Sequence, residues 1–334
     1  EYWVSISADS ATGTSDVDAS VKFRDGNTSD DFEIFNALFP TQWLIIGEKV
    51  KIFKDSALLF ESASFNLPTA WVVDVFCRSE DLAPLKEYTI RWYKPDGSEF
   101  AVTAPPKTSD ASGTISHQIA IDNNPANMGN WRVKVTNPLN THIACENIFQ
   151  IVSPANPSII VSLPAKVSVG QQFNASATII NNGGALFKTA YPGTLLKGGA
   201  GGDAVFISGP APALQDVSGN SAATFSYLLQ AGTAGTFTLR GAGYGYDGNS
   251  DAFLTAATHT SNICTIQTPP NLSVVSITEA YNDVYCNQQN LTVTMRIRNN
   301  GQADAVVEAA SLTFSLGTHN QKVNPPATFP FVLA

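Results

Sequence analysis

One stretch of this chain occurs twice, about 118 residues apart, and it constrains the fold more than any other feature. Residues 173–184 read FNASATIINNGG and residues 291–302 read LTVTMRIRNNGQ. In both stretches apolar side chains occupy alternate positions, and an Asn-Asn-Gly turn follows. A period of two is the pattern of a β-strand that buries one face. The repeat therefore predicts two copies of one β-sheet unit.

Other stretches extend the same pattern. Residues 72–77, 131–135 and 236–241 also alternate between apolar and polar side chains. Helical periodicity is scarce: residues 30–39 predict one or two helical turns, which Pro40 would end. Short strands separated by turns rich in Gly, Asn and Pro indicate β-sandwiches. The sequence therefore predicts an all-β protein.

Composition limits which binding partners and which cellular location can be expected for this protein. The chain has 334 residues, of which 43% are hydrophobic and 14% charged, which predicts two or three domains with sizeable cores. Its formal net charge of −9 argues against nucleic acid and anionic lipid, because both attract clustered Lys and Arg. No transmembrane segment or signal peptide is recognised, and the chain begins in a strand-like run typical of a processed protein. This composition favours a secreted, extracellular or cell-surface protein.

Two proline-bearing stretches, residues 153–158 and 268–271, are predicted to be short, stiff linkers. They divide the chain into segments of different character. The predicted segments are a strand-rich amino-terminal part (1–44), a first sandwich (45–152), a second sandwich (158–267) and a third, apparently incomplete one (271–334).

Residues 158–334 resemble the Ig-like repeat modules of secreted and surface proteins of bacteria and archaea, including the cell-adhesion-related domain CARDB. The stretches that support the resemblance are 167–185, 207–247, 261–266, 270–277 and 291–305. Residues 45–152 are more generally similar to Ig-like or macroglobulin-like sandwiches, through the hairpin 88–100 and the stretch 128–137. The resemblance implies tandem Ig-like antiparallel β-sandwiches in an elongated array, at a surface location.

The last segment is much shorter than the one that it repeats. Half a sandwich leaves an open strand edge and an uncovered apolar face. Three explanations remain open: the chain is part of a longer protein, another subunit donates a strand, or the segment is an unusual small fold. The candidate donor strand is residues 2–8, in which Tyr2, Val4 and Ile6 share one face.

The sequence shows no catalytic or cofactor-binding motif. The four histidines, His117, His142, His259 and His319, lie far apart, without a second ligand at metal-binding spacing. Two loops rich in oxygen donors are candidate calcium sites, although Asp and Asn are also common turn residues. The candidate ligands are Asp25, Asn27, Asp30, Asp31 and Glu33 in the first loop, and Asp247, Asn249 and Asp251 in the second.

Cysteines and sequons point to modifications of a secreted chain. The four cysteines form no metal-binding motif, and their even number predicts two disulfides. We favour Cys77–Cys145 and Cys264–Cys286 among three possible pairings, with buried thiols as the alternative. Glycan acceptor triplets begin at Asn27, Asn174, Asn271 and Asn290. The five tryptophans are predicted to lie in the core rather than to bind sugars.

These features predict a non-enzymatic structural or adhesive protein, such as a subunit or stalk of a cell-surface filament. Its expected partners are further copies of itself, other surface proteins or glycans. The alternatives are a carbohydrate-binding accessory region of a larger secreted hydrolase, and an enzyme whose site lies in the first segment.

Overall fold

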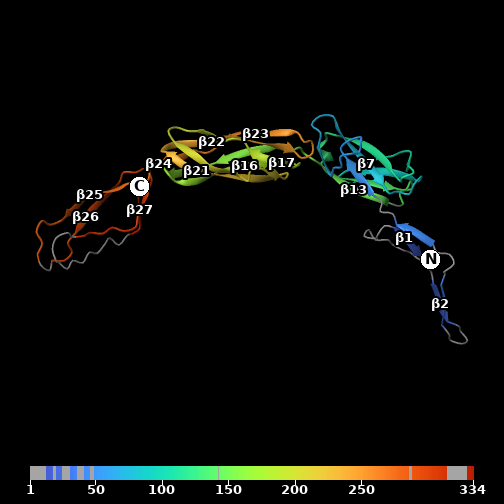
Figure 1. Cartoon of the computed structure of the whole chain (residues 1–334), viewed down its shortest axis with the longest axis horizontal. Coiled ribbons are helices and arrows are strands. Elements are labelled where there is room, and N and C mark those ends of the chain that lie inside the picture. The colour runs from blue at the N-terminus through green and yellow to red at the C-terminus, as the bar shows by residue number, and fades with distance from the viewer. Residues whose placement is uncertain are drawn as a thin grey trace. The chain divides into compact units, whose positions relative to one another are not determined.

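The computed structural model describes residues 13–17, 20–24, 31–35, 41–45, 49–141, 143–285, 288–313 and 329–334. Before residue 49 it describes only the backbone of four strands. The chain divides into two compact units, Glu1–Pro154 and Ala155–Ala334, and each is described by itself (Figure 1). Strands dominate both units, and the one helical element in the described ranges is the 3-10 turn Pro125–Asn127. No helix there is long and apolar enough to span a membrane.

The first strands of unit 1 form two antiparallel pairs. β1 (Gly13–Val17) pairs with β4 (Thr41–Ile45), and β2 (Ser20–Arg24) pairs with β3 (Asp31–Phe35). The helical turn predicted for residues 30–39 is therefore wrong over β3. In the register of β2 and β3, Val21 is opposite Ile34 and Phe23 is opposite Phe32. Cross-strand pairing of β-branched and aromatic residues favours the strand.

The rest of unit 1 is an Ig-like sandwich. One sheet has the order β11-β7-β5, formed by Ile115–Asp122, Val72–Glu80 and Lys49–Phe53. The other has the order β10-β8-β12-β13-β6, formed by Lys107–Thr108, Glu87–Tyr93, Gly129–Thr136, Ile143–Val152 and Ser64–Asn66, with β9 (Glu99–Val102) also on β8. In immunoglobulin lettering, read from β5 and from β6, these sheets are A-B-E and A′-G-F-C-C′. β6 runs parallel to β13, and the other pairs are antiparallel.

Aromatic side chains fill the core of this sandwich. Trp131 stacks on Phe149 with ring centroids 6.0 Å apart, and Trp92 meets Phe149 edge to face at 5.9 Å. Both indole N–H groups are satisfied: Trp131 donates to the Asn127 carbonyl (2.7 Å) and Trp92 to His117 Nδ1 (3.0 Å). The prediction of a core position is confirmed for these two tryptophans. It is wrong for Trp71, which is 88% exposed because it precedes β7 at a positive φ of 65°.

Unit 2 begins with a second Ig-like sandwich. One sheet has the order β14-β16-β21-β19, formed by Pro157–Ser162, Gln172–Asn181, Ser221–Thr233 and Asp203–Ala211. The other has the order β15-β24-β22-β17-β20, formed by Lys166–Ser168, Cys264–Gln267, Gly235–Asp247, Phe187–Pro192 and Gln215–Val217. β18 (Leu196–Gly198) and β23 (Phe253–Thr260) also pair with β22. The first order corresponds to A-B-E-D, and the stretch from β15 to β17 in the second corresponds to A′-G-F-C. The all-β, Ig-like fold is thereby confirmed.

The turn that follows β16 is organised by one buried asparagine. Asn181 Oδ1 accepts hydrogen bonds from the backbone N–H groups of Asn156 and Gly183, both at 3.0 Å. Its Nδ2 donates to the carbonyls of Ala185 (2.7 Å) and Val217 (3.2 Å). A single side chain therefore joins the linker before β14, the turn after β16 and the strand β20.

The last strands reproduce this arrangement. β25 (Leu272–Glu279) pairs with β26 (Val293–Asn299), and β27 (Ala305–Val307) pairs with β28 (Phe331–Leu333). Asn299 Oδ1 accepts from the N–H groups of Asn271 (3.1 Å) and Gly301 (3.0 Å), and its Nδ2 donates to the carbonyls of Ala303 and Leu333. The repeat seen in the sequence is therefore a repeat of structure, in which β25, β26, β27 and β28 correspond to β14, β16, β17 and β20.

Candidate functional site

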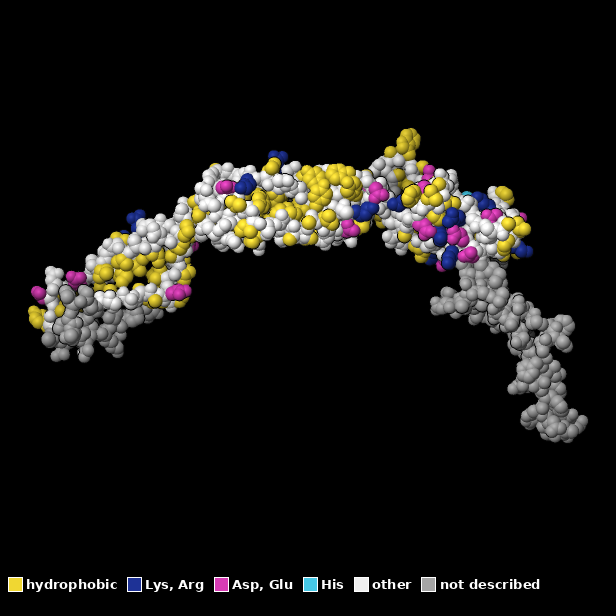
Figure 2. Space-filling model, in the orientation of Figure 1, with side chains coloured by type: hydrophobic (Ala, Val, Ile, Leu, Met, Phe, Trp, Pro, Cys, Tyr) yellow, Lys and Arg dark blue, Asp and Glu magenta, His cyan; other side chains and the backbone are white. Residues whose placement is uncertain are grey.

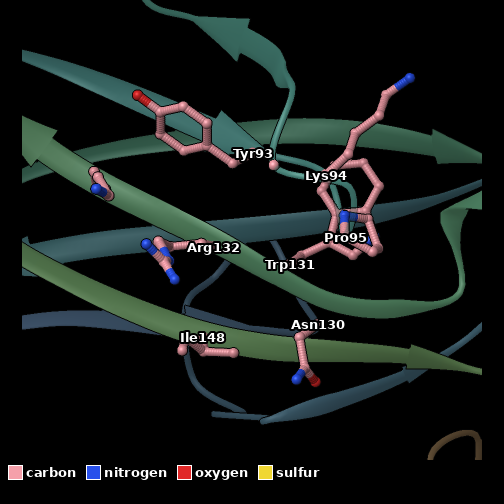
Figure 3. A pocket seen from close by; sticks show the side chains of 9 residues that line it. Tyr93, Lys94, Pro95, Asn130, Trp131, Arg132 and Ile148 are labelled. Atoms are coloured by element: carbon pink, nitrogen blue, oxygen red, sulfur yellow. The ribbon is translucent and has the colours of Figure 1, made fainter.

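A pocket lies on the outer face of the unit 1 sandwich and has a volume of about 370 Å³ (Figure 3). The end of β8, the turn that follows it, and the strands β12 and β13 form its walls. The lining residues are Tyr93, Lys94, Pro95, Gly97, Asn130, Trp131, Arg132, Lys134 and Ile148. Tyr93, Arg132 and Ile148 come from three neighbouring strands in Figure 3.

Local sequence rules place these side chains on the outer face. Along β12 the buried residues Trp131 and Val133 alternate with Arg132 and Lys134, so both cations point away from the core. The turn after β8 is fixed by Asp96, whose Oδ1 accepts from the N–H and hydroxyl of Ser98 at 2.9 and 2.7 Å. Gly97 takes the positive φ of 84° that this turn requires. The turn therefore forms a rigid rim.

The pocket is cationic and aromatic. Lys134 Nζ lies 5.6 Å from the centre of the Tyr93 ring and 3.7 Å from a carboxylate oxygen of Glu146. Lys94, Arg132 and Lys134 all line the pocket, although the whole chain has a formal net charge of −9. Such a local excess of positive charge attracts an anionic group, and a guanidinium binds carboxylates and sulfates through paired donors. The lining residues include no carboxylate, thiol or imidazole.

No motif in the sequence marks this pocket by itself. Its signal was available in the outward positions of Arg132 and Lys134 and in the Pro95-Asp96-Gly97 turn. What the sequence did not show is that β8 and β12 are neighbours, with Tyr93 opposite Arg132 in the register. Only this pairing brings the turn beside the two cations.

The predicted disulfide Cys77–Cys145 is not formed in the structure, where Cys77 is a buried free thiol. Cys145 Sγ lies 4.0 Å from Ser79 Oγ, and Cys145 belongs to the same core cluster as Cys77 and interacts with it electrostatically. Cys264 is also a buried free thiol, and Cys286 lies outside the described residues. Burial raises the pKa of the Cys77 thiol to about 12, and it raises that of Cys264.

The raised pKa of Cys77 predicts a loss of stability of unit 1 in alkali. Above the ordinary thiol pKa of about 8.5, the unfolded state loses a proton that the folded state keeps. Stability should therefore fall between about pH 9 and pH 12, by up to about 1.4 kcal/mol per pH unit. Urea unfolding followed by tryptophan fluorescence at pH 8, 9 and 10 measures it. Cys77→Ala should show a smaller decrease with pH, and equal slopes in the two proteins would contradict the prediction.

The two predicted calcium loops have different outcomes. Of the first, Asp25, Asn27 and Asp30 lie outside the described residues, whereas Asp31 and Glu33 belong to β3. In the second, the buried Asp247 organises the protein itself: its Oδ1 accepts from the N–H groups of Asn249 (2.9 Å) and Ser250 (2.8 Å). Its Oδ2 accepts from the Ala155 N–H at 2.7 Å. Calcium binding by either loop stays a prediction.

The remaining predicted sites are exposed or undescribed. Asn174, Asn271 and Asn290 are exposed, and Asn27 lies outside the described residues. Glycosylation at these positions stays a prediction. The candidate donor strand, with Tyr2, Val4 and Ile6, also lies outside the described residues. In the part of the chain that the structure describes, no three His, Cys, Asp or Glu residues are grouped as metal ligands.

A second candidate surface is the open face of the β25–β26 pair. In the second sandwich, Ile159 on β14 is 4% exposed and Ile179 on β16 is fully buried. Their counterparts differ: Val274 on β25 is 55% exposed, and Ile297 on β26 is half-buried. β16 also pairs with β21, whereas among the described strands β26 pairs only with β25. The β25–β26 pair therefore resembles one sheet of a sandwich that lacks the counterparts of β21 and β19 among the described strands.

Comparison with known proteins finds no matching family model and no matching curated protein. No match therefore supports the CARDB-like resemblance, and the Ig-like assignment depends on the strand order.

Solved structures that the chain resembles include E. coli alpha-2-macroglobulin in its native conformation, with 8% identity and a TM-score of 0.26 over 79% of this chain and 20% of that chain. Another is the titin fragment I67–I69, with 13% identity and a TM-score of 0.28 over 63% of this chain and 64% of the fragment. A third is Salmonella alpha-2-macroglobulin reacted with methylamine, with 10% identity and a TM-score of 0.26 over 78% of this chain and 19% of that chain. The chain spans about a fifth of the first of these, and likenesses at such TM-scores support no argument about function.

Proposed function

We propose that this chain is a non-enzymatic structural and adhesive protein of the cell surface, and a subunit of an extracellular filament assembled from Ig-like sandwiches. The observation that supports the proposal best is the open β25–β26 pair. Among the described strands, β26 has one edge without a partner, and an added strand would both bind the backbone groups of that edge and cover the apolar face around Val274.

The second sandwich indicates what such a strand would do. There, β21 runs antiparallel to β16 over the register Gln172–Asn181, and its buried residues Phe225 and Leu229 cover the sheet. A strand placed likewise on β26 would complete the ladder and cover the exposed apolar side chains. In our proposal a second copy supplies it through residues 2–8. Tyr2, Val4 and Ile6 then take the positions of the inward residues of β21.

Adhesion in this proposal uses surfaces on the completed sandwiches. The cationic pocket of unit 1 offers Arg132 and Lys134 to an anionic group on a partner. Antiparallel ladders in each sandwich resist extension, and short proline-bearing linkers limit the freedom of the modules. These properties suit a protein that bears a load between a surface and its ligand.

The test of assembly is negative-stain microscopy combined with variants of the donor strand. Val4→Asp should abolish filaments, because it places a charge on the face that would be buried. Ser5→Asp, one residue along and on the opposite face, is the matched control and should leave filaments intact. Filaments that persist after Val4→Asp and after deletion of residues 1–8 would exclude strand donation.

A further inference from the structure

Four aromatic side chains gather on the outer face of the second sandwich. Tyr191 lies on β17, Tyr244 and Tyr246 lie on β22, and Phe253 begins β23. Tyr191, Tyr246 and Phe253 are 38%, 43% and 53% exposed, and Tyr244 is half-buried. We call these four residues the aromatic row. In Figure 2, hydrophobic side chains form a continuous patch over the end of this sandwich at which β17 and β23 are labelled in Figure 1.

The row exists because β22 has its smallest residues on the buried face and large aromatic residues on the outer face, the reverse of the usual arrangement. Its sequence GAGYGY places Gly241, Gly243 and Gly245 toward the core and the tyrosines toward solvent. The inward glycines cannot be enlarged without displacement of core residues: a Cβ on Gly245 would lie 2.7 Å from the Phe187 ring, and one on Gly243 would lie 3.1 Å from Ile179. Folding therefore explains the glycines, but it does not explain exposed aromatics opposite them, since large apolar residues normally face the interior.

The rings support one another. Tyr191 and Tyr244 have centroids 5.6 Å apart, Tyr244 and Phe253 lie 6.0 Å apart with planes only 11° from parallel, and Phe253 meets Tyr246 edge to face at 5.4 Å. Tyr244 also lies over Gly193, where a Cβ would come within 2.5 Å of its ring. Side chains that are already fixed in this way lose little conformational entropy when they bind a ligand.

Charge and size indicate what the row binds. The neighbouring cation, Lys188 on β17, is neutralised by an ion pair with Asp251 at 2.5 Å, so the surroundings favour a neutral ligand. At roughly 150–250 Å² for each aromatic side chain, these exposed fractions amount to about 300 Å². A stable protein interface buries about 800 Å² on each partner, far more than the row offers.

We propose that the aromatic row binds neutral polysaccharide, with the C–H faces of successive sugar rings packed on the aromatic rings. The tyrosine hydroxyls of the row can donate to and accept from sugar hydroxyls. The inference deepens the adhesive part of the proposed function and rests on it, but it does not depend on filament assembly.

The test is binding of the full chain to cellulose, chitin and xylan as probes. Binding to at least one of them should be unaffected by 0.5 M salt and should weaken about tenfold in Tyr244→Ala. Phe253→Ser should weaken binding as well. Because Phe253 is the most exposed residue of the row, this variant still tests the proposal if Tyr244→Ala fails to fold. Trp71→Ala, an exposed aromatic in unit 1, is the matched control and should bind normally.

Several outcomes would overturn the inference. The first is that none of the three polysaccharides binds. The second is that both variants of the row bind as tightly as the unmodified chain. A third is binding that disappears in salt, which would assign it to the cationic pocket. A fourth is self-association that is lost in Tyr244→Ala, because the row would then be a protein interface. Microscopy of the Val4→Asp variant is independent of these results, so failure of sugar binding is distinguishable from failure of assembly.

Discussion

Replacement of Asn181 by alanine is expected to destabilise the second sandwich by about 4 kcal/mol. The side chain is fully buried, and its loss leaves two N–H groups and at least two carbonyls without their partner. Each buried polar group left unsatisfied costs about 1–3 kcal/mol, although some of them will recover a water molecule. Part of the effect is geometric, since Asn181 joins the linker at Asn156 to the turn and to Val217.

The chain provides its own controls for this measurement. All five tryptophans lie before residue 155, so tryptophan fluorescence reports on unit 1 and far-ultraviolet circular dichroism reports on both units. In urea, Asn181→Ala should lower the midpoint seen by circular dichroism and leave the fluorescence transition unchanged. Asn182→Ala, which removes only exposed contacts to Asn156 and Ser158, should cost less than about 1 kcal/mol. Similar effects of the two substitutions would contradict the role given to Asn181.

Replacement of Trp131 by alanine should destabilise unit 1 by about 3–5 kcal/mol, the usual cost of removal of a large aromatic side chain from a core. Trp131 is fully buried, stacks on Phe149 and meets Phe100 edge to face at 5.0 Å. It also lines the cationic pocket, together with Pro95 of the turn after β8.

Fluorescence of the four remaining tryptophans, among which Trp92 is fully buried, follows this unfolding in urea. Arg132→Ala is the matched control, because Arg132 is the next residue of the same strand but faces solvent, and it should change stability by less than about 0.5 kcal/mol. A loss below about 1 kcal/mol in Trp131→Ala would show that the aromatic cluster contributes little to the fold.

The fold of the repeated segments could be predicted because alternation depends only on local sequence. Phe173, Ala175, Ala177 and Ile179 were expected on one face, and all four are buried. The alternation of Trp131 and Val133 with Arg132 likewise predicted which face of β12 is buried. Residues 30–39 were misread because a short apolar run fits both a helical and a strand period, and the pairing with β2 decided between them.

The sites were harder to predict, since they depend on neighbours across sheets. The Cys77–Cys145 pairing was inferred from an even count of cysteines, which contains no information about which core positions face each other. Both cysteines lie in the core of the first sandwich, where no disulfide joins them in the structure. The aromatic row was missed for a similar reason. The tyrosines of GAGYGY were not singled out, and only the pairing of β22 with β17 and β23 places Tyr191 and Phe253 beside them.

The sequence alone determined that the chain forms strands, which faces of the repeated strands are apolar, and that one strand-and-turn unit occurs twice. These properties follow from the two-residue period of a strand and from the turn preferences of Asn and Gly. Only the tertiary structure decided which strands are neighbours, and therefore which side chains form the pocket and the aromatic row. Pairing between distant strands depends on the packing of whole sheets, which no local pattern specifies.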